Sequence, residues 1–372
     1  MEMKPLGVLL VLVLVGSLVI VLTALLAVEP TTAQQFSEWS PPTNLNAIVL
    51  SDGTPCPALV NSAHNDQHPA VSKDGLSLVF TSNRPRPNGV SDGFYLWVTQ
   101  RASVDDCWQE PQYLGDVVNI VQPPFACPPV AGATPICAYA PNLTTDGHWM
   151  YFHSNRTDGC NGGVTHGELW VTHRHDARDN FGWEKPINLG CAINTQGFVL
   201  AGPTHFEDDT TGIQYLYFTR RPIGVSDDYF AVYVSTCSAD LATCNTQGLW
   251  GPGERVDALF VPPDLLNNFG RTTRTAIRRR DGLEMIFSSR RAGGVGRMIE
   301  LWTSTRSTTL DQNWSAPVNL GTVVNSTANN GAPALSWDGT ELYFYSNRTD
   351  LPGAHTGVND LYFSKRTKLT TP

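Results

Sequence analysis

Short apolar runs alternate with polar, turn-forming stretches along most of the chain. Within a run, neighbouring residues differ in character, as in Leu342 and Phe344 against Tyr343 and Asn347. This period of two is typical of a strand with two different faces. Beyond the first 33 residues no stretch keeps a helical period. The pattern therefore predicts an all-β protein made of short strands.

The runs form a unit that recurs five times. Two clear copies read HPAVSKDGLSLVFTSNRP, GFYLWVTQR, CWQEPQYLG and APNLTTDGHWMYFHSNRT, GELWVTHR, GWEKPINLG. Each unit predicts four antiparallel strands, and a tryptophan opens the fourth. These tryptophans are Trp39, Trp108, Trp183, Trp250 and Trp314, at intervals of 69, 75, 67 and 64 residues. Such a period indicates a repeat architecture.

Asp-Gly pairs separate the first and second strands of four units. They occur at Asp74-Gly75, Asp146-Gly147, Asp281-Gly282 and Asp338-Gly339. Because glycine accepts a positive φ, each pair predicts a hairpin with a two-residue turn.

The last unit ends without its tryptophan segment, and that missing segment stands near the start of the chain as EWSPPTNLN, residues 38–46. Radially repeated four-stranded sheets form a β-propeller, whose ring must close or leave exposed edges. We therefore expect residues 34–372 to form a five-bladed β-propeller. In this ring the N-terminal segment is the outer strand of the last blade, next to NDLYFSKR.

The consensus of the repeat is P-x-x-S-x-D-G-x-x-L-x-F-x-S-x-R, then D/E-L-W/Y-x-S-x-R, then W-x-x-P-x-N-L-G. It resembles the WD40-like propeller repeats of TolB-like and related bacterial exported proteins. The resemblance implies the fold and leaves the function open, because that family includes binding scaffolds, periplasmic partners and domains attached to hydrolases. Blade three (HFEDDTTGIQYLYFTRRP) and blade four (RTAIRRRDG) depart most from the consensus, and two explanations stay open for them: a special site or simple drift of the sequence.

The first 33 residues have the character of a targeting element. Leu6–Val28 is a run of 23 residues without charge, and Thr31-Thr32-Ala33 has the small residues of a cleavage site. Two interpretations remain open: a cleaved signal peptide or an N-terminal membrane anchor. Both predict an extracytoplasmic location for the remainder.

Eight cysteines without a C-x-x-C spacing agree with export and predict disulfides. The local pairs Cys127 with Cys137 and Cys237 with Cys244 are the first expectations.

Only 16% of the 372 residues are charged, and the formal net charge is −9. A negative chain disfavours a nucleic-acid partner, which needs a basic surface. Nothing indicates a cofactor, and we expect a monomer that contacts a membrane only through its N-terminal segment.

The connections from strand two to three and from strand four to the next blade share one face and are long, so we expect a ligand there. Two sets of charged residues repeat on this face. The arginines are Arg84, Arg156, Arg221, Arg291 and Arg348, and the acids are Asp92, Glu168, Asp228, Glu300 and Asp360. They either fasten each blade internally or form a ring that binds a polyhydroxylated or anionic ligand. Phe94, Phe125 and Tyr229 are candidates for stacking on sugars.

Histidines also gather on this side: His64, His68, His166, His205 and His355. His64 and His68 are the candidate ligand-binding pair. His173 and His175 alternate so as to share one strand face, but no spacing of three or four ligands predicts a metal site.

Three functions are consistent with these residues. The first is a binding module for a carbohydrate or a protein. The second is a carbohydrate-active hydrolase or lyase, which uses paired carboxylates at the channel mouth. Acids outside the repeat consensus are the candidates: Asp66, Glu207, Asp208 and Asp209. The third is a structural envelope scaffold. The lack of a catalytic motif favours the first.

Overall fold

The computed structural model describes residues 36–119, 137–156, 158–160, 167–267, 269–310 and 312–369. Glu38–Thr367 form one compact unit, and the adjoining terminal residues belong to a separate small unit in which Phe36 pairs with Lys368. The expected leader lies outside the described residues. No helix of the described residues is long and apolar enough to cross a membrane.

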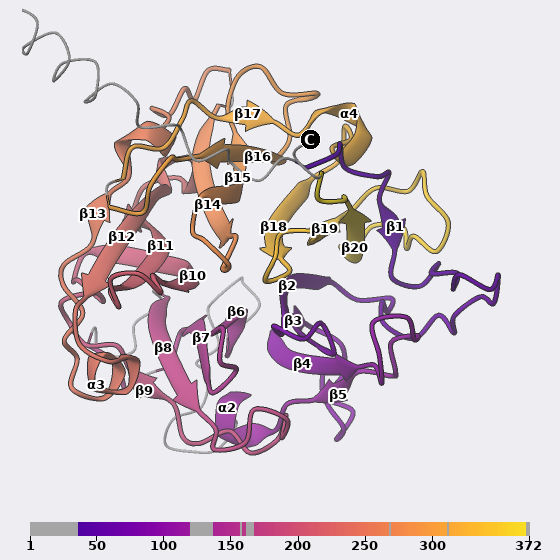
Figure 1. Ribbon diagram of the computed structural model, residues 1–372, viewed down its shortest axis with the longest axis horizontal. Coiled ribbons are helices and arrows are strands. Elements are labelled where there is room, and N and C mark those ends of the chain that lie inside the picture. Colours follow the sequence, from indigo (N-terminus) through magenta and orange to yellow (C-terminus); the bar gives the residue numbers. More distant parts are fainter. Residues whose placement is uncertain are drawn as a thin grey trace, which may run out of the picture. The chain divides into compact units, whose positions relative to one another are not determined.

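The unit Glu38–Thr367 is a five-bladed β-propeller, as the sequence predicts (Figure 1). Each blade is a four-stranded antiparallel sheet. Blade one has β2 (Asp66–Val71), β3 (Ser77–Ser82), β4 (Tyr95–Gln100) and β5 (Gln112–Tyr113). Blade two has β6 (Tyr139–Leu143), β7 (Trp149–Ser154), β8 (Glu168–His173) and β9 (Ile187–Asn188). Blade three has β10 (Phe198–Glu207), β11 (Gln214–Pro222), β12 (Ala231–Cys237) and β13 (Glu254–Arg255).

Blade four has β14 (Gly270–Ile277), β15 (Glu284–Arg290), β16 (Glu300–Thr305) and β17 (Val318–Asn319). Blade five has β18 (Asn330–Leu335), β19 (Glu341–Ser346), β20 (Asp360–Lys365) and, from the start of the chain, β1 (Thr43–Asn44). Short helical turns lie in the connections: α2 (Asp116–Asn119), α3 (Leu241–Thr246), α4 (Gly321–Val324), η1 (Asp227–Tyr229) and η2 (Asp257–Leu259).

The ring closes through the N-terminal strand, which confirms the role predicted for residues 38–46. Thr43 pairs with Phe363 and Asn44 with Tyr362. β1 therefore lies beside β20 in Figure 1 although their sequence positions are more than 300 apart. Because this strand covers the edge of blade five, that edge is not left unpaired.

The core lies between blades, because both faces of each sheet are buried. In β3, Leu78 and Phe80 pack toward blade five, where Tyr343 and Leu361 meet them. The intervening Val79 packs toward blade two. This alternation is the period of two that the sequence shows, with both faces apolar at the centre of the sheet.

The Asp-Gly segments are hairpins, but the expected two-residue turns are wrong. Ser72 pairs with Ser77, so four residues form the turn, and Gly75 has a φ of 73°. The Asp74 carboxylate accepts the backbone N–H of Leu76 at 3.0 Å and so holds the longer loop. The Asp-Gly pair therefore fixes the position of the turn but not its length.

A repeated arginine links each of these hairpins to the tryptophan that precedes the fourth strand. In blade one, Arg101 Nε donates to the Gly75 carbonyl at 2.8 Å, and the guanidinium lies 4.4 Å from the Trp108 ring. The other blades with this arrangement use Arg174 with Trp183, Arg306 with Trp314 and Arg366 with Trp39. Blade three has no Asp-Gly turn, and Cys237, at the end of β12, forms a disulfide with Cys244.

Three disulfides lie within the described residues: Cys56–Cys107, Cys160–Cys191 and Cys237–Cys244. The third is one of the two local pairs expected from sequence. Cys127, the expected partner of Cys137, lies outside the described residues. Disulfides are typical of proteins that fold outside the reducing cytoplasm.

Candidate functional site

The five inner strands β2, β6, β10, β14 and β18 surround a central channel. Each contains a bulge at the same position, where one residue has a positive φ. These residues, here called the channel ring, are His68 (54°), Ala140 (50°), Gly202 (57°), Arg274 (52°) and Ala332 (47°). A proline follows in four blades, and Thr275 replaces it in blade four. His68 and Arg274 are thus the only members of the ring with polar side chains.

The channel itself is narrow. The cavity that the inner strands line measures about 40 Å³, which is room for a few water molecules. Among the described residues, no Asp or Glu lines it. A ligand larger than water must therefore bind at a mouth of the channel and not inside it.

Arg279 spans the channel on the side of the Asp-Gly turns, here called the hairpin face. Its Nη1 donates to the Leu143 carbonyl at 2.8 Å and its Nη2 to the Val71 carbonyl at 2.9 Å. Blade four is thereby joined to blades two and one. Burial lowers the pKa of Arg279 to about 10, so it remains charged at neutral pH. Arg279 restricts the channel at this end.

The opposite side carries the long connections and is here called the loop face. A group of polar and aromatic side chains from four blades meets at the channel there. We call it the mouth cluster: His68, Tyr139, His153, Arg274 and Tyr345. Arg274 Nε donates to His68 Nε2 at 3.0 Å. The His68 ring centroid lies 4.3 Å from that of Tyr139 and 5.6 Å from that of Tyr345.

The charge of the mouth cluster comes from arginine alone. Burial, and then the positive charge of Arg274, lower the pKa of His68 well below its usual value, and the same two causes act on His153. Both imidazoles are therefore neutral at pH 7. Burial lowers the pKa of Arg274 only to about 10, so its guanidinium stays positive. Its Nη1 is buried and has no hydrogen-bond partner among the residues the structure describes.

Blade three provides the space for the Arg274 side chain, and blade four provides Arg274 itself. These are the two blades whose sequences depart most from the repeat. A Cβ added at Gly202 would lie 2.7 Å from Cδ of Arg274, so only glycine leaves room for this side chain. The segment RTAIRRRDG places Arg274 in the channel ring and Arg279 at the hairpin face. The departures of blades three and four from the consensus did not by themselves select Arg274.

The candidate catalytic acids do not reach this mouth. Asp66 is fully buried, and its carboxylate pairs with Arg84 Nη2 at 2.6 Å and accepts the Ser62 N–H at 2.6 Å. Glu207, Asp208 and Asp209 lie together at the β10–β11 turn on the hairpin face, where they line a separate cavity of about 280 Å³. Of the four acids predicted from sequence, three share a cavity and the fourth, Asp66, belongs to an internal ion pair.

Four of the five repeated arginines point inward. Each donates from Nη2 to the carbonyl of a residue in the preceding connection: Arg84 to Val60, Arg156 to Val118, Arg291 to Leu259 and Arg348 to Val324. Each also lies over a ring of its own blade, as Arg156 does over Trp170 at 4.8 Å. This is the internal fastening that the sequence left open as one alternative. Arg221 differs, because it pairs with Asp227 at 2.9 Å near the surface.

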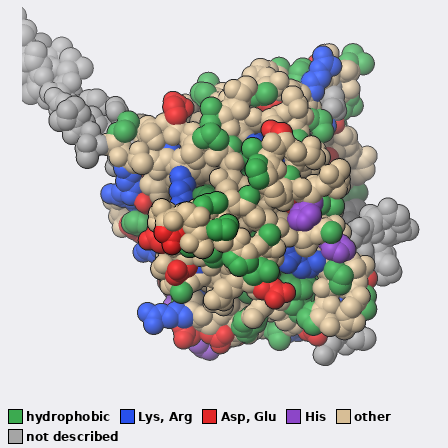
Figure 2. Space-filling view, turned by 90° about the vertical axis from the view of Figure 1, so that its right-hand side faces the viewer, with side chains coloured by type: hydrophobic (Ala, Val, Ile, Leu, Met, Phe, Trp, Pro, Cys, Tyr) green, Lys and Arg blue, Asp and Glu red, His purple; other side chains and the backbone are tan. Residues whose placement is uncertain are grey.

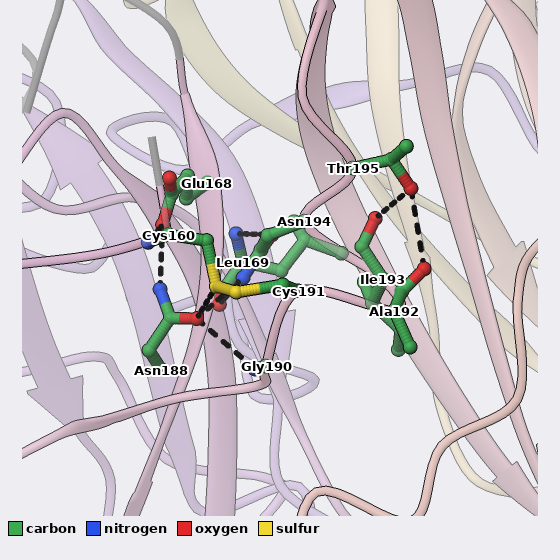
Figure 3. Close-up of a disulfide and its surroundings, with 10 residues drawn as sticks. All are labelled: Cys160, Glu168, Leu169, Asn188, Gly190, Cys191, Ala192, Ile193, Asn194 and Thr195. Carbon is green, nitrogen blue, oxygen red and sulfur yellow. Dashed lines mark hydrogen bonds between the residues drawn. A yellow bond between two sulfur atoms is a disulfide. The ribbon is translucent and has the colours of Figure 1, made fainter. Parts of the chain in front are cut away.

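The repeated acids hold the long loops. Glu168 accepts hydrogen bonds from the Cys160 backbone N–H at 3.0 Å and from Asn188 Nδ2 at 2.6 Å, beside the Cys160–Cys191 disulfide (Figure 3). Glu300 and Asp360 bond in the same way to Asn319 and Asn44. Asp92 instead pairs with Arg86, and Asp228 with Arg290. All five carboxylates thus have partners within the fold.

A repeated asparagine, which the sequence reasoning missed, fastens the connection between blades to the third strand of a blade. Asn194 accepts the Leu169 N–H at 2.8 Å and donates to the Leu169 carbonyl at 3.0 Å, as Figure 3 shows. Asn61, Asn119 and Asn325 make equivalent pairs of bonds. The sequence did contain a signal for this contact, because an asparagine occurs in four of the connections between blades.

The histidines do not form one group. His68 belongs to the mouth cluster, whereas His64 lies in the preceding loop, where its backbone N–H bonds to Ser62. His205, which the sequence grouped with the histidines of the long-loop side, is instead buried within strand β10, and His355 bonds to Asp360. His166 and Phe125 lie outside the described residues. Phe94 packs edge-on against Tyr139 at 5.2 Å, and Tyr229 is exposed.

The surface agrees with the low fraction of charged residues in the sequence. On the side of the molecule in Figure 2, blue and red side chains form small mixed groups among larger tan and green areas. No broad basic area is seen on this side. The prediction that nucleic acid is not a partner still rests on the negative net charge of the chain.

No family model matches the sequence, and no curated protein matches it. Solved structures do resemble the fold. A thermostable family-43 glycoside hydrolase aligns with a TM-score of 0.53 and 13% identity over 87% of this chain and 94% of its own. The catalytic domain of a Coprinopsis cinerea GH62 α-L-arabinofuranosidase aligns with a TM-score of 0.52 and 11% identity over 90% and 98%. An α-L-arabinofuranosidase from Lactobacillus brevis gives 0.51 and 14% over 87% and 95%. These likenesses establish the fold alone.

Proposed function

We propose that this protein is an extracytoplasmic carbohydrate-recognition propeller that binds an acidic sugar, such as a uronate or sulfated residue, at the loop-face mouth of its channel. One observation carries the proposal. Arg274 presents a buried, unpaired Nη1 in a cluster whose two histidines are neutral. A guanidinium of this kind binds a carboxylate or sulfate through charge-assisted hydrogen bonds.

The surroundings of Arg274 suit a sugar better than a bare anion. Tyr139 lies under its guanidinium at 5.6 Å, and Phe94 packs against Tyr139. Aromatic rings offer apolar faces to the C–H groups of a pyranose. Gln67 donates to the Tyr139 hydroxyl at 2.6 Å and accepts from Asn359 at 2.9 Å, which adds amides suited to hydroxyl groups. The solved structures of similar fold act on carbohydrates according to their titles, which supports this class of ligand.

A hydrolase is the second candidate, and the same solved structures favour it. Hydrolysis of a glycoside usually needs two carboxylates on opposite sides of the bond. The cavity lined by Glu207, Asp208 and Asp209 is the place that offers them. Burial raises the pKa of Asp208, but hydrogen bonds from Thr309 and from the Thr210 and Thr211 backbone outweigh it and lower the pKa overall. Asp208 therefore suits a base or nucleophile, and Glu207 or Asp209 would be the acid.

The two candidates are separated by one experiment. The purified protein is titrated with polygalacturonate and with its fully methyl-esterified form, which has the same sugar backbone without the charge. We expect binding of the acid form only, and a loss of about tenfold or more in Arg274→Gln, since a charge-assisted hydrogen bond contributes about 1.5–3 kcal/mol. Arg297→Gln, an exposed arginine on the β15–β16 loop, removes the same charge and is the control. The same comparison of charged and uncharged polymer is then made with a sulfated polysaccharide and its desulfated form.

Release of reducing ends is followed in the same samples, with Asp208→Asn alongside. Turnover that Asp208→Asn abolishes and Arg274→Gln does not would establish the hydrolase and overturn the proposed binding site. Equal binding of charged and neutral polymers, or equal affinities of Arg274→Gln and Arg297→Gln, would also refute it.

A further inference from the structure

A second group of side chains lies on blade two, apart from the mouth cluster. His173 is the last residue of β8, and His175 follows two positions later. The backbone N–H of Glu184 donates to the His173 carbonyl at 2.8 Å, which brings the chain back beside them. We call His173, His175 and Glu184 the blade-two triad. The sequence predicted that the two histidines share one strand face. Their ring centroids do lie 5.1 Å apart, but β8 ends at His173, so His175 follows the strand, and the third residue comes from beyond a loop.

The ligand atoms of the triad face one another. His173 Nδ1 lies 3.4 Å from Glu184 Oε2, and His175 Nε2 lies 2.9 Å from Glu184 Oε1. All three groups lie within 4.8 Å of one another. Two nitrogens and one oxygen therefore converge on a small volume.

These separations suit a tetrahedral metal ion. With Zn–N and Zn–O bonds of about 2.0–2.1 Å, two ligand atoms of a tetrahedron are about 3.3 Å apart. The two measured nitrogen–oxygen distances, 3.4 Å and 2.9 Å, lie on either side of this value. Two imidazoles and one carboxylate are also a donor set that prefers zinc or copper to calcium or magnesium, which select oxygen ligands.

We propose that the blade-two triad binds one divalent transition-metal ion, most favourably Zn²⁺, through His173 Nδ1, His175 Nε2 and Glu184. The fourth coordination position is open to solvent, because the side chain of His175 is 88% exposed and that of Glu184 is 48% exposed. Binding there replaces the contact between the imidazoles and the Glu184 carboxylate, in which His175 Nε2 lies 2.9 Å from Oε1.

The metal would stabilise a loop that touches the neighbouring blade. Its ligands flank residues 176–183, where Asn180 Nδ2 donates to Ser77 Oγ of blade one at 3.0 Å. An ion that binds only the folded chain raises its stability by mass action. The midpoint of thermal unfolding should therefore rise with the Zn²⁺ concentration.

Isothermal titration of the untagged protein with ZnCl₂ tests the proposal. We expect one ion per chain, and affinity reduced about tenfold or more in His175→Ala and in Glu184→Gln. Both side chains are exposed, so folding should not depend on them, and the unfolding midpoint without metal checks this. His148→Ala is the matched control, because His148 stacks on His173 at 6.2 Å but its Nδ1 bonds to the Arg174 carbonyl.

Copper provides an independent measurement. The electron paramagnetic resonance spectrum of the Cu²⁺-loaded protein should show coupling to two nitrogens, and to one in His175→Ala. Affinity unchanged in both triad variants, equal loss in His148→Ala, or no binding at micromolar Zn²⁺ would overturn the proposal. CaCl₂ should give no heat at the same concentrations, and binding of Ca²⁺ at this triad would also contradict it.

Discussion

The Nε–H of Arg274 in blade four donates a hydrogen bond of 3.0 Å to Nε2 of His68 in blade one. Since Nε2 is the acceptor and the imidazole is neutral, its proton is on Nδ1. The bond joins two blades across the channel, and it fixes the guanidinium whose buried Nη1 is the proposed ligand contact. The position of the proposed anion site therefore depends on His68, although His68 carries no charge.

We predict a measurable coupling between these two residues. In a double-mutant cycle of His68→Phe and Arg274→Met, the coupling free energy of unfolding should be about 1.5–3 kcal/mol, as for hydrogen bonds to charged groups. Phenylalanine keeps a ring between Tyr139 and Tyr345. Urea unfolding of the four proteins gives the value. Additive effects of the two substitutions would show that the bond does not contribute to stability.

Acid should destabilise the fold through buried neutral histidines. His205 is 1% exposed and bonds through Nε2 to Gln214 Oε1 at 2.9 Å. Burial lowers its pKa from 6.5 to about 4. Between these values the unfolded chain binds the proton and the folded chain does not, so the free energy of unfolding falls as the pH falls. From pH 7 to 5 the loss from His205 alone should be about 2 kcal/mol.

Urea unfolding at pH 7, 6 and 5 measures this slope. In His205→Asn it should be shallower by that amount, because asparagine does not titrate. Parallel pH profiles for the parent protein and His205→Asn would refute the explanation. His68 and His153, which are also buried and neutral, should add to the slope in the same direction.

The disulfides should differ in their effect on stability. Cys56 and Cys107 are 51 residues apart, whereas Cys237 and Cys244 are 7 apart. If a disulfide acts mainly on the unfolded chain, loop closure contributes about 4 kcal/mol in the first case and about 2 kcal/mol in the second. Replacing each pair by alanine and measuring urea unfolding tests this order. A larger loss from the Cys237–Cys244 pair would indicate that native packing decides instead.

The five-bladed ring could be predicted because its signals are local and repeated. The tryptophan intervals count the blades, and the displaced segment at residues 38–46 shows how the ring closes. The length of the Asp-Gly turns could not be read from the dipeptide. It depends on the Asp74 side chain accepting a backbone N–H two residues on, which stabilises the longer loop.

The mouth cluster could not be predicted from the sequence, for a different reason. Arg274 and His68 are 206 residues apart and meet only because the same bulge occurs in two inner strands. Arg274 is the one charged residue at the position that His68, Ala140, Gly202 and Ala332 occupy in the other blades, and this was a visible signal. Tyr139 and Tyr345 had no such signal. The repeated arginines, by contrast, were visible but are mostly used inside the blades.

The last prediction concerns the closure of the ring by the N-terminal strand. Trp39 is 8% exposed and lies 4.3 Å from the Arg366 guanidinium, and Leu45 is 1% exposed and donates its N–H to the Leu361 carbonyl at 3.0 Å. Trp39→Ala and Leu45→Ala should each reduce the free energy of unfolding by about 2–5 kcal/mol. The double variant should also release β1 from β20 and expose the edge of blade five, which favours pairing with another chain. Light scattering after size-exclusion chromatography should then detect oligomers, whereas Pro41→Ala, an exposed change in the same segment, should stay like the parent protein. A double variant with parental stability and mass would mean that the ring is held closed without its N-terminal strand.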